Sequence, residues 1–261
     1  MEIDIRDFAP ELARRLVEHA INTGSPMLLS GPRGSGKTKL VLSSATALGR
    51  PVEVFHCGGA TDVEATIFGT VTLRDGETHF QRSRFVSAIQ KPFTVVVLDE
   101  VNRVGNPRVQ GALMSCMDFQ ARLVLDQEDD PDERVVHVAE GVTFVCTANI
   151  GAGYQGTEPL DAAFLDRMLK HGLDYSEREA ELLVLHGLGE DVAQRVMALV
   201  RSIRSQSRSG ALTGSMSTRG LVYVADLLKA GFSMEEAFEA VVGVWDEDSR
   251  AALRAALAVT P

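Results

Sequence analysis

One glycine-rich segment of the sequence has the residue types and spacing that bind phosphate. It reads Gly31-Pro32-Arg33-Gly34-Ser35-Gly36-Lys37-Thr38 and matches the pattern G-x-x-x-x-G-K-[S/T] at every fixed position. Its glycines allow backbone N–H groups to point inward around a phosphate, Lys37 adds a positive point charge, and Thr38 offers a hydroxyl to Mg²⁺. We expect this segment, together with the adjoining Lys39, to bind the phosphates of ATP with Mg²⁺.

Two adjacent acids, Asp99 and Glu100, follow the apolar run Thr94–Leu98. In an open α/β sheet, ligands bind at the carboxyl ends of the strands, so an acidic pair in this position is suited to nucleotide chemistry. We expect Asp99 to hold Mg²⁺ together with Thr38, directly or through water, and Glu100 to polarise the attacking water of an ATPase. Without the phosphate-binding segment upstream, the same pair would read as two solvated residues at a strand end.

Short apolar runs alternate with helical patterns through the first two thirds of the chain, which is typical of a parallel sheet covered on both faces. The helical stretches include Lys37–Leu48, directly after the phosphate-binding segment, and Pro107–Asp118. A strand before that segment and a helix after it are the context in which the motif works. We expect strands at Met27–Ser30, Val52–His56, Phe93–Leu98, Val142–Ala148 and His171–Tyr175.

Two further segments have the alternation of β-hairpins. Residues 70–81 alternate around Asp75-Gly76, which is a strong turn signal. Residues 122–138 form the second candidate, whose apolar arms flank a very acidic tip from Asp126 to Glu133. We expect the tip to be a solvated turn kept flexible by like-charge repulsion. Binding of a cation or of a basic client by the tip stays open.

Beyond Tyr175 the sequence contains only helical patterns, at 176–187, 190–206, 217–230, 233–243 and 246–258. Ser176 and Glu179 have the spacing of a helix-capping box, and Trp245 is expected in the core of this helical part. We therefore expect two domains. Residues 1–175 would form an α/β nucleotide-binding domain with the hairpins as insertions (about 70–81 and 122–138), and residues 176–261 a small all-helical domain.

Composition restricts the class of protein. The 261 residues carry a net charge of −10, which argues against a general nucleic-acid binder because the phosphate backbone requires a basic surface. No apolar run reaches membrane-spanning length, and the first residues lack the features of a signal peptide. The scattered Cys57, Cys116 and Cys146 favour buried thiols in a reducing cytoplasm over disulfides or a zinc site. No metal role is expected for His56, His79, His137 and His171.

Together these features resemble the AAA+ ATPases. Residues 142–149 look like the sensor 1 strand of that family, which would place Asn149 beside the γ-phosphate or the attacking water. Residues 160–168 resemble the arginine-finger segment, which would bring Arg167 to the γ-phosphate bound in a neighbouring subunit. Ser217-Thr218-Arg219 resembles sensor 2, which would let Arg219 contact the nucleotide from the helical lid of its own subunit.

Each of these three assignments has a plainer alternative. Asn149 could be a turn former. Arg167 could form a surface ion pair with Asp161 or Asp166. Arg219 could be an ordinary arginine at the start of a helix.

The two hairpins and the segment Asp99-Glu100-Val101-Asn102-Arg103 narrow the resemblance to the MoxR-like clade, which includes the CbbQ and NorQ types. Met168 departs from the clade, which usually has Phe there, with little effect expected. The resemblance implies the αβα sandwich of P-loop NTPases with a helical lid, and a ring, expected to be a hexamer, with active sites between subunits. It also implies a partner with a von Willebrand factor A domain and a client protein.

The resemblance therefore favours a Mg²⁺-dependent ATPase motor of the cytoplasm that remodels or activates its client, as a chaperone or activase does, for example during metal insertion. A nucleic-acid translocase of a restriction or defence system is the alternative. It would need basic hairpins facing a pore, where Arg82 and Arg84 could lie if they are not surface residues, but the second hairpin has an acidic tip. A scaffold that binds ATP without hydrolysis is the third hypothesis, and intact Lys37, Glu100 and Arg167 argue against it.

Overall fold

The computed structural model describes residues 5–58, 62–149, 160–210, 212, 214–242, 247, 250, 251 and 254. Its central sheet consists of β1 (Met27–Gly31), β2 (Val52–His56), β5 (Val95–Asp99), β8 (Thr143–Asn149) and β9 (Leu169–Gly172). These strands lie in the order β2-β5-β8-β1-β9, and every neighbouring pair is parallel. Their carboxyl ends therefore meet at one edge of the sheet.

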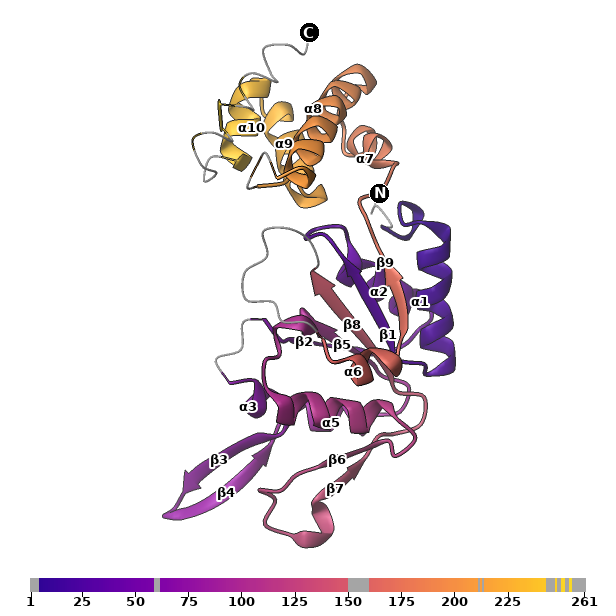
Figure 1. Cartoon of the computed structure of the whole chain (residues 1–261), viewed down its shortest axis with the longest axis vertical. Coiled ribbons are helices and arrows are strands. Elements are labelled where there is room, and N and C mark those ends of the chain that lie inside the picture. The colour runs from indigo at the N-terminus through magenta and orange to yellow at the C-terminus, as the bar shows by residue number, and fades with distance from the viewer. Residues whose placement is uncertain are drawn as a thin grey trace.

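Helices cover both faces of the sheet, which makes it the middle layer of an αβα sandwich (Figure 1). One face is covered by α1 (Glu11–Thr23) and α2 (Lys37–Ala47), and the other by α3 (Val63–Ile67), α4 (Arg84–Ile89) and α5 (Pro107–Met117). Alternate residues of β5 supply the two cores: Val95 and Val97 are buried on one side, Val96 and Leu98 on the other. The predicted fold class, a parallel αβα sandwich followed by a helical region, is confirmed.

The helical region has a core of its own, which includes Leu183, Val200, Leu221 and Phe238. It lies at the end of the molecule opposite the hairpins (Figure 1). Trp245 and most of the predicted helix 246–258 lie outside the described residues. Within the described part of the chain, no helix combines the length and the apolar character that crossing a membrane requires. The helices are α7 (Glu179–Leu185), α8 (Glu190–Arg208), α9 (Thr218–Lys229) and α10 (Met234–Val242).

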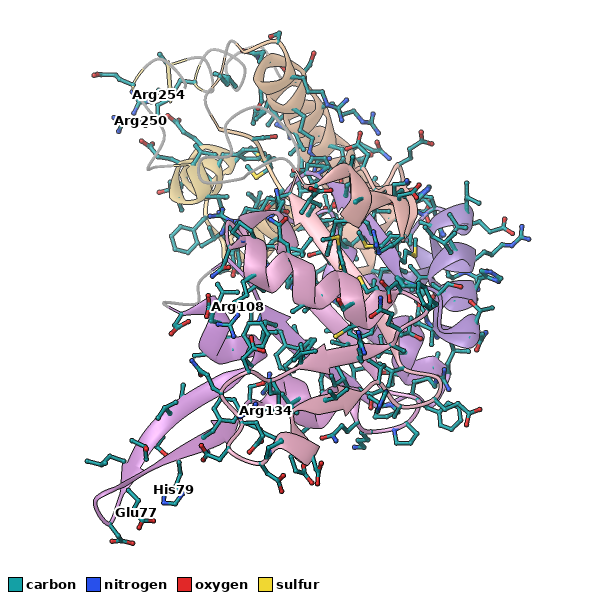
Figure 2. The ribbon with its side chains drawn as sticks, turned by 60° about the horizontal axis from the view of Figure 1, so that its bottom comes forward. Glu77, His79, Arg108, Arg134, Arg250 and Arg254 are labelled. Carbon is teal, nitrogen blue, oxygen red and sulfur yellow. The ribbon has the colours of Figure 1, made fainter. Side chains whose placement is uncertain are left out.

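Two antiparallel hairpins project at the other end of the molecule (Figure 1). In the first, β3 (Gly69–Arg74) and β4 (Glu77–Arg82) are joined by Asp75 and Gly76, whose φ values of 52° and 86° suit a type I′ turn. Glu77 and His79 lie at its outer end, away from the sheet (Figure 2). The second hairpin consists of β6 (Arg122–Val124) and β7 (Val135–His137), with the short 3-10 helix η3 (Pro131–Glu133) in its acidic tip.

The acidic tip is tied to the first hairpin and is not merely a solvated turn. Arg82 of β4 donates hydrogen bonds to the carboxylates of Glu128 at 2.8 Å and Glu133 at 2.6 Å. The neighbouring Arg84 donates to the carbonyl oxygen of Val54 at 2.6 Å. Both arginines therefore have partners within their own chain, and the two hairpins form one connected unit.

The last strand lies earlier in the chain than expected, at Leu169–Gly172 instead of His171–Tyr175. Leu173 N still donates to Ser30 O at 2.7 Å. A Cβ atom on Gly31 would lie 2.0 Å from the Leu173 carbonyl oxygen. The two backbones are thus in close contact at this point, where β1 gives way to the glycine-rich loop.

The predicted capping box at Ser176 and Glu179 is wrong. α7 begins at Glu179, and no side chain caps it. Ser176 instead donates its hydroxyl hydrogen to the carbonyl oxygen of Phe8 at 2.6 Å. Glu179 is only 1% exposed and takes part in a buried ion pair within the helical region, so its side chain is not available to the helix start.

Candidate nucleotide site

The glycine-rich segment forms a tight loop between β1 and α2, here called the phosphate loop (residues 31–38). Gly34 has a φ of 71°, and a Cβ atom on it would lie 2.7 Å from the Ser217 Cβ atom at the start of α9. Gly36 directly precedes α2, whose N-terminal N–H groups and dipole favour an anion. A side chain at Gly31 or Gly34 would therefore not fit, which suits a backbone cradle for phosphates. Of the other predicted loop residues, Pro32 and Arg33 lie between Gly31 and Gly34, and Ser35 lies between Gly34 and Gly36. Lys39 is exposed on the first turn of α2.

Lys37 lies at the centre of the site and is only 5% exposed. Its Nζ atom donates to the carbonyl oxygens of Gly31 at 3.1 Å and Pro32 at 2.8 Å, and to Asn149 Oδ1 at 2.9 Å. Burial lowers the pKa of the Lys37 ammonium to about 8, although the charges of Asp99 and Glu100 act in the opposite direction. An ammonium kept out of water beside the loop is suited to bind phosphate oxygens.

Asp99 accepts hydrogen bonds from two hydroxyl groups. Thr38 Oγ1 donates to Asp99 Oδ1 at 2.7 Å, and Thr147 Oγ1 donates to the same oxygen at 2.6 Å. The other carboxylate oxygen lies 3.2 Å from His56 Nδ1. A carboxylate and a threonine hydroxyl in contact are hard oxygen donors of the kind that Mg²⁺ prefers, so the pair Thr38 and Asp99 fits the predicted Mg²⁺ site.

Glu100 is held by residues from two segments, β8 and the turn after β5. Asn149 Nδ2 donates to Glu100 Oε1 at 2.7 Å, and Arg103 Nε lies 2.9 Å from Glu100 Oε2 in an ion pair. The Glu100 backbone N–H donates to Thr147 Oγ1 at 3.1 Å. A Cβ atom on Gly58 would come within 2.2 Å of Glu100 Oε2, so the carboxylate also depends on a glycine after β2.

The structure brings five of the predicted residues together, namely Lys37, Thr38, Asp99, Glu100 and Asn149. Sequence reasoning missed four neighbours of this group. The strand register pairs His56 with Asp99. His56 and Thr147 are polar residues at or near the ends of predicted strands, but this became a signal for them only once the strand order was known. No local signal pointed to Gly58 or to the side chain of Arg103.

Arg167 lies away from this group. It follows α6 (Ala162–Asp166) and donates to the Ala163 carbonyl oxygen at 2.6 Å. Its guanidinium is also 3.9 Å from Asp118 Oδ2. Among the described residues its acidic neighbour is thus Asp118, not Asp161 or Asp166, since Asp161 instead caps α6 by accepting from Ala163 N.

Arg219 is exposed on the first turn of α9. The helix begins with Ser217, whose hydroxyl oxygen accepts from Gly220 N at 3.1 Å. Because Ser217 also abuts Gly34, the segment that carries Arg219 borders the phosphate loop. Arg167 and Arg219 are therefore placed differently: the first outside the site of its own chain, the second at its rim.

Two comparisons of sequence identify similar proteins. Residues 26–168 match the family model described as AAA domain (dynein-related subfamily), and residues 179–259 match the CbbQ/NirQ/NorQ C-terminal model. BssE of Thauera aromatica, to which a chaperone role is ascribed by name, is 30% identical over 226 residues, which cover 85% of this chain and 74% of BssE. Protein NorQ of Paracoccus denitrificans is 29% identical over 229 residues, which cover 86% of this chain and 81% of NorQ.

A comparison of structures agrees at the level of the fold. A mutant of RuvB from Thermotoga maritima superposes with a TM-score of 0.57 at 17% sequence identity, over 96% of this chain and 75% of RuvB. At this identity the likeness concerns the fold alone.

Proposed function

Because this chain belongs to the AAA+ ATPases of the MoxR-like type, with a CbbQ/NirQ/NorQ C-terminal region, we propose that it is a Mg²⁺-dependent ATPase motor that works as a ring on a client protein. The observation that carries the proposal is the hydrogen-bonded group of Lys37, Thr38, Asp99, Glu100 and Asn149 at the carboxyl ends of three adjacent strands.

The chain supplies a binding site for the triphosphate in this proposal. The phosphate loop and the N-terminus of α2 direct N–H groups at the phosphates. Lys37 exchanges its carbonyl partners Gly31 and Pro32 for β- and γ-phosphate oxygens. Thr38 and Asp99 would hold Mg²⁺, which would supply positive charge beside the phosphates.

Glu100 and Asn149 act on the attacking water. Glu100 accepts a hydrogen bond from the water and orients it, as a carboxylate within reach of a nucleophile can. Asn149 bonds to both Lys37 and Glu100, with its amide oxygen and its amide nitrogen respectively. A change in the partners of Lys37 is therefore passed directly to Glu100, which links phosphate binding to the position of the water.

Arg167 completes the site of a neighbouring subunit in this proposal. Its contacts lie on α6 and at the end of α5, away from Lys37 and Glu100 of its own chain. A planar cation fixed on one protomer can stabilise the transferring phosphoryl group on the next, and such head-to-tail contacts close into rings. We propose a hexamer, with a von Willebrand factor A domain protein as partner.

The first hairpin offers a surface for the client. Val71 and Leu73 are 54% and 72% exposed, and the hairpin projects at the end opposite the helical region (Figure 1). BssE, the relative with a chaperone name, supports remodelling of a protein as the output. The connection of both hairpins through Arg82 would let them move together on the client.

A mixing experiment tests the shared site. Phosphate release should fall by about a thousandfold or more in Arg167→Ala and by about a hundredfold or more in Glu100→Gln. Binding of a fluorescent adenine nucleotide should persist in both variants. In an equal mixture, about one quarter of the junctions (one half multiplied by one half) combine an intact Glu100 with an intact Arg167, and activity should return.

The matched control mixes Glu100→Gln with the double variant Glu100→Gln/Arg167→Ala. No junction in this mixture has an intact Glu100, so none is complete. If the first mixture is no more active than this control, Arg167 does not act between subunits.

A further inference from the structure

Tyr175 stands where the chain passes from the sheet to the helical region, and it touches both sides. Its phenolic hydroxyl donates to the carbonyl oxygen of Arg33 in the phosphate loop at 3.1 Å. The guanidinium carbon of Arg204, from α8, lies 3.6 Å from the centre of the Tyr175 ring. One side chain therefore links the loop backbone to a cation of the helical region.

Arg204 in turn fixes the start of α9. It is 8% exposed, and its Nε atom donates to the Met216 carbonyl oxygen at 2.8 Å. Its two terminal nitrogens donate to the carboxylate of Glu179, which is 1% exposed and also accepts from the Thr218 hydroxyl. Both residues bound in this way, Met216 and Thr218, lie within three positions of Arg219.

A second contact joins the phosphate loop to the start of α9. Gly34 of the phosphate loop lies against Ser217, so close that a Cβ atom on Gly34 would be 2.7 Å from the Ser217 Cβ atom. The loop therefore meets the helical region twice, through the Arg33 carbonyl and through Gly34. Both contacts lead to the first turn of α9.

The buried ion pair favours a geometric role over a purely stabilising one. Removing a carboxylate and a guanidinium from water costs several kcal/mol per ion, and apolar side chains in their place are often as stable or more so. A planar guanidinium, however, can hold a carboxylate, a carbonyl and an aromatic ring at fixed angles at the same time. This is the arrangement that Arg204 makes.

We propose that Tyr175 and Arg204 are positioning residues that hold the start of α9 in register with the phosphate loop, so that Arg219 reaches the bound nucleotide. The proposal rests on the proposed function, because it concerns the same site. Nucleotide affinity depends on the Tyr175 hydroxyl in this scheme, and it does so through Arg219.

Tyr175→Phe removes the hydrogen bond to the Arg33 carbonyl oxygen but keeps the aromatic ring against Arg204. The Kd of a fluorescent adenine nucleotide and the KM for ATP should rise roughly threefold to tenfold, the usual range for one lost hydrogen bond, with kcat retained. Tyr223→Phe is the matched control, since Tyr223 is 55% exposed on α9, and it should bind like wild type. Both variants should give the circular dichroism spectrum of wild type, which shows that they are folded.

A double-mutant cycle decides whether the effect passes through Arg219. In an Arg219→Ala background, Tyr175→Phe should weaken binding no further. Full additivity would overturn the proposal, and so would a Tyr175→Phe protein that binds as tightly as wild type. A wild-type protein that binds no nucleotide would instead overturn the proposed function, and this inference with it.

Arg204→Lys provides an independent variant. It keeps a cation beside Glu179 but removes the planar group that reaches Met216 and covers the Tyr175 ring. Its nucleotide Kd should rise at least as much as that of Tyr175→Phe. Wild-type affinity in a folded Arg204→Lys protein would contradict the role given to the guanidinium.

Discussion

Replacing Lys37 with Met should change how the stability of the nucleotide-free protein responds to pH. Burial lowers the pKa of the Lys37 ammonium from an ordinary 10.5 to about 8, with Asp99 and Glu100 opposing the shift. The folded state therefore binds this proton more weakly than the unfolded state does. At neutral pH the ammonium destabilises the fold, and the destabilisation fades as the pH rises from about 8 towards 10.5.

The magnitude follows from the pKa values. At ~1.4 kcal/mol per pKa unit, the lowering from 10.5 to about 8 corresponds to roughly 3 kcal/mol at neutral pH. Linkage then predicts that the unfolding free energy of wild type rises by about 2 kcal/mol, relative to Lys37→Met, between about pH 7 and about pH 9.5.

Only the difference between the two proteins is informative. Burial raises the pKa of the Cys57 and Cys116 thiols to about 12. Because the folded state holds these protons more tightly, stability falls in both proteins as the pH rises above the ordinary thiol value of 9.0. Subtracting the two curves removes this common background and leaves the contribution of Lys37.

Urea unfolding followed by circular dichroism, at several pH values and without nucleotide, measures the difference. Nucleotide binding should respond with the opposite sign: the affinity of wild type should fall as the pH passes 8, by up to about tenfold per pH unit, because the cation is lost. Parallel stability curves for wild type and Lys37→Met would refute the view of Lys37 as a buried, destabilising charge.

Two further predictions concern contacts around the site and the hairpins. Gly34→Ala should weaken nucleotide binding, because the new methyl group collides with Ser217. Gly76→Ala is the matched control, since Gly76 has a similar positive φ of 86° but nothing lies within 4 Å of the added carbon. Equal nucleotide binding by both variants would rule out the collision as the cause. Arg82→Ala should weaken the contact between the two hairpins by about 1 kcal/mol and speed amide hydrogen exchange in residues 69–82. Arg122→Ala, at an exposed position of β6, is the control and should leave the exchange unchanged. Unchanged exchange in Arg82→Ala would show that other contacts hold the hairpins together.

The main residues of the candidate site were predictable because short, continuous stretches of the sequence identify them. The loop around Lys37 is one continuous motif, and Asp99 and Glu100 follow an apolar run that only a buried strand explains. The sheet order was not predictable in the same way, since parallel pairing depends on contacts between distant segments. His56 and Thr147 are next to Asp99 only because β2 and β8 flank β5.

The departures from expectation have the same origin. Ser176 and Glu179 satisfy the local rule for a helix cap, but the long-range partner Arg204 takes the carboxylate. The acidic tip satisfies the rule for a solvated turn, but Arg82 from the other hairpin binds it. In both cases a charged side chain found a more favourable partner far away in the sequence, which no local pattern records.

The backbone at Glu100 brings the two acids at the end of β5 to one candidate site. Successive side chains of a strand point to opposite faces, so Asp99 and Glu100 would face apart if β5 continued. Glu100 instead has a φ of 57°, a left-handed conformation that costs a non-glycine residue roughly 1–2 kcal/mol. The turn ends the strand there and lets both carboxylates serve one site, Asp99 against Thr38 and Glu100 against Asn149. The contacts of Glu100 with Asn149 and Arg103 offset this cost, so the left-handed conformation is retained where the two carboxylates come together.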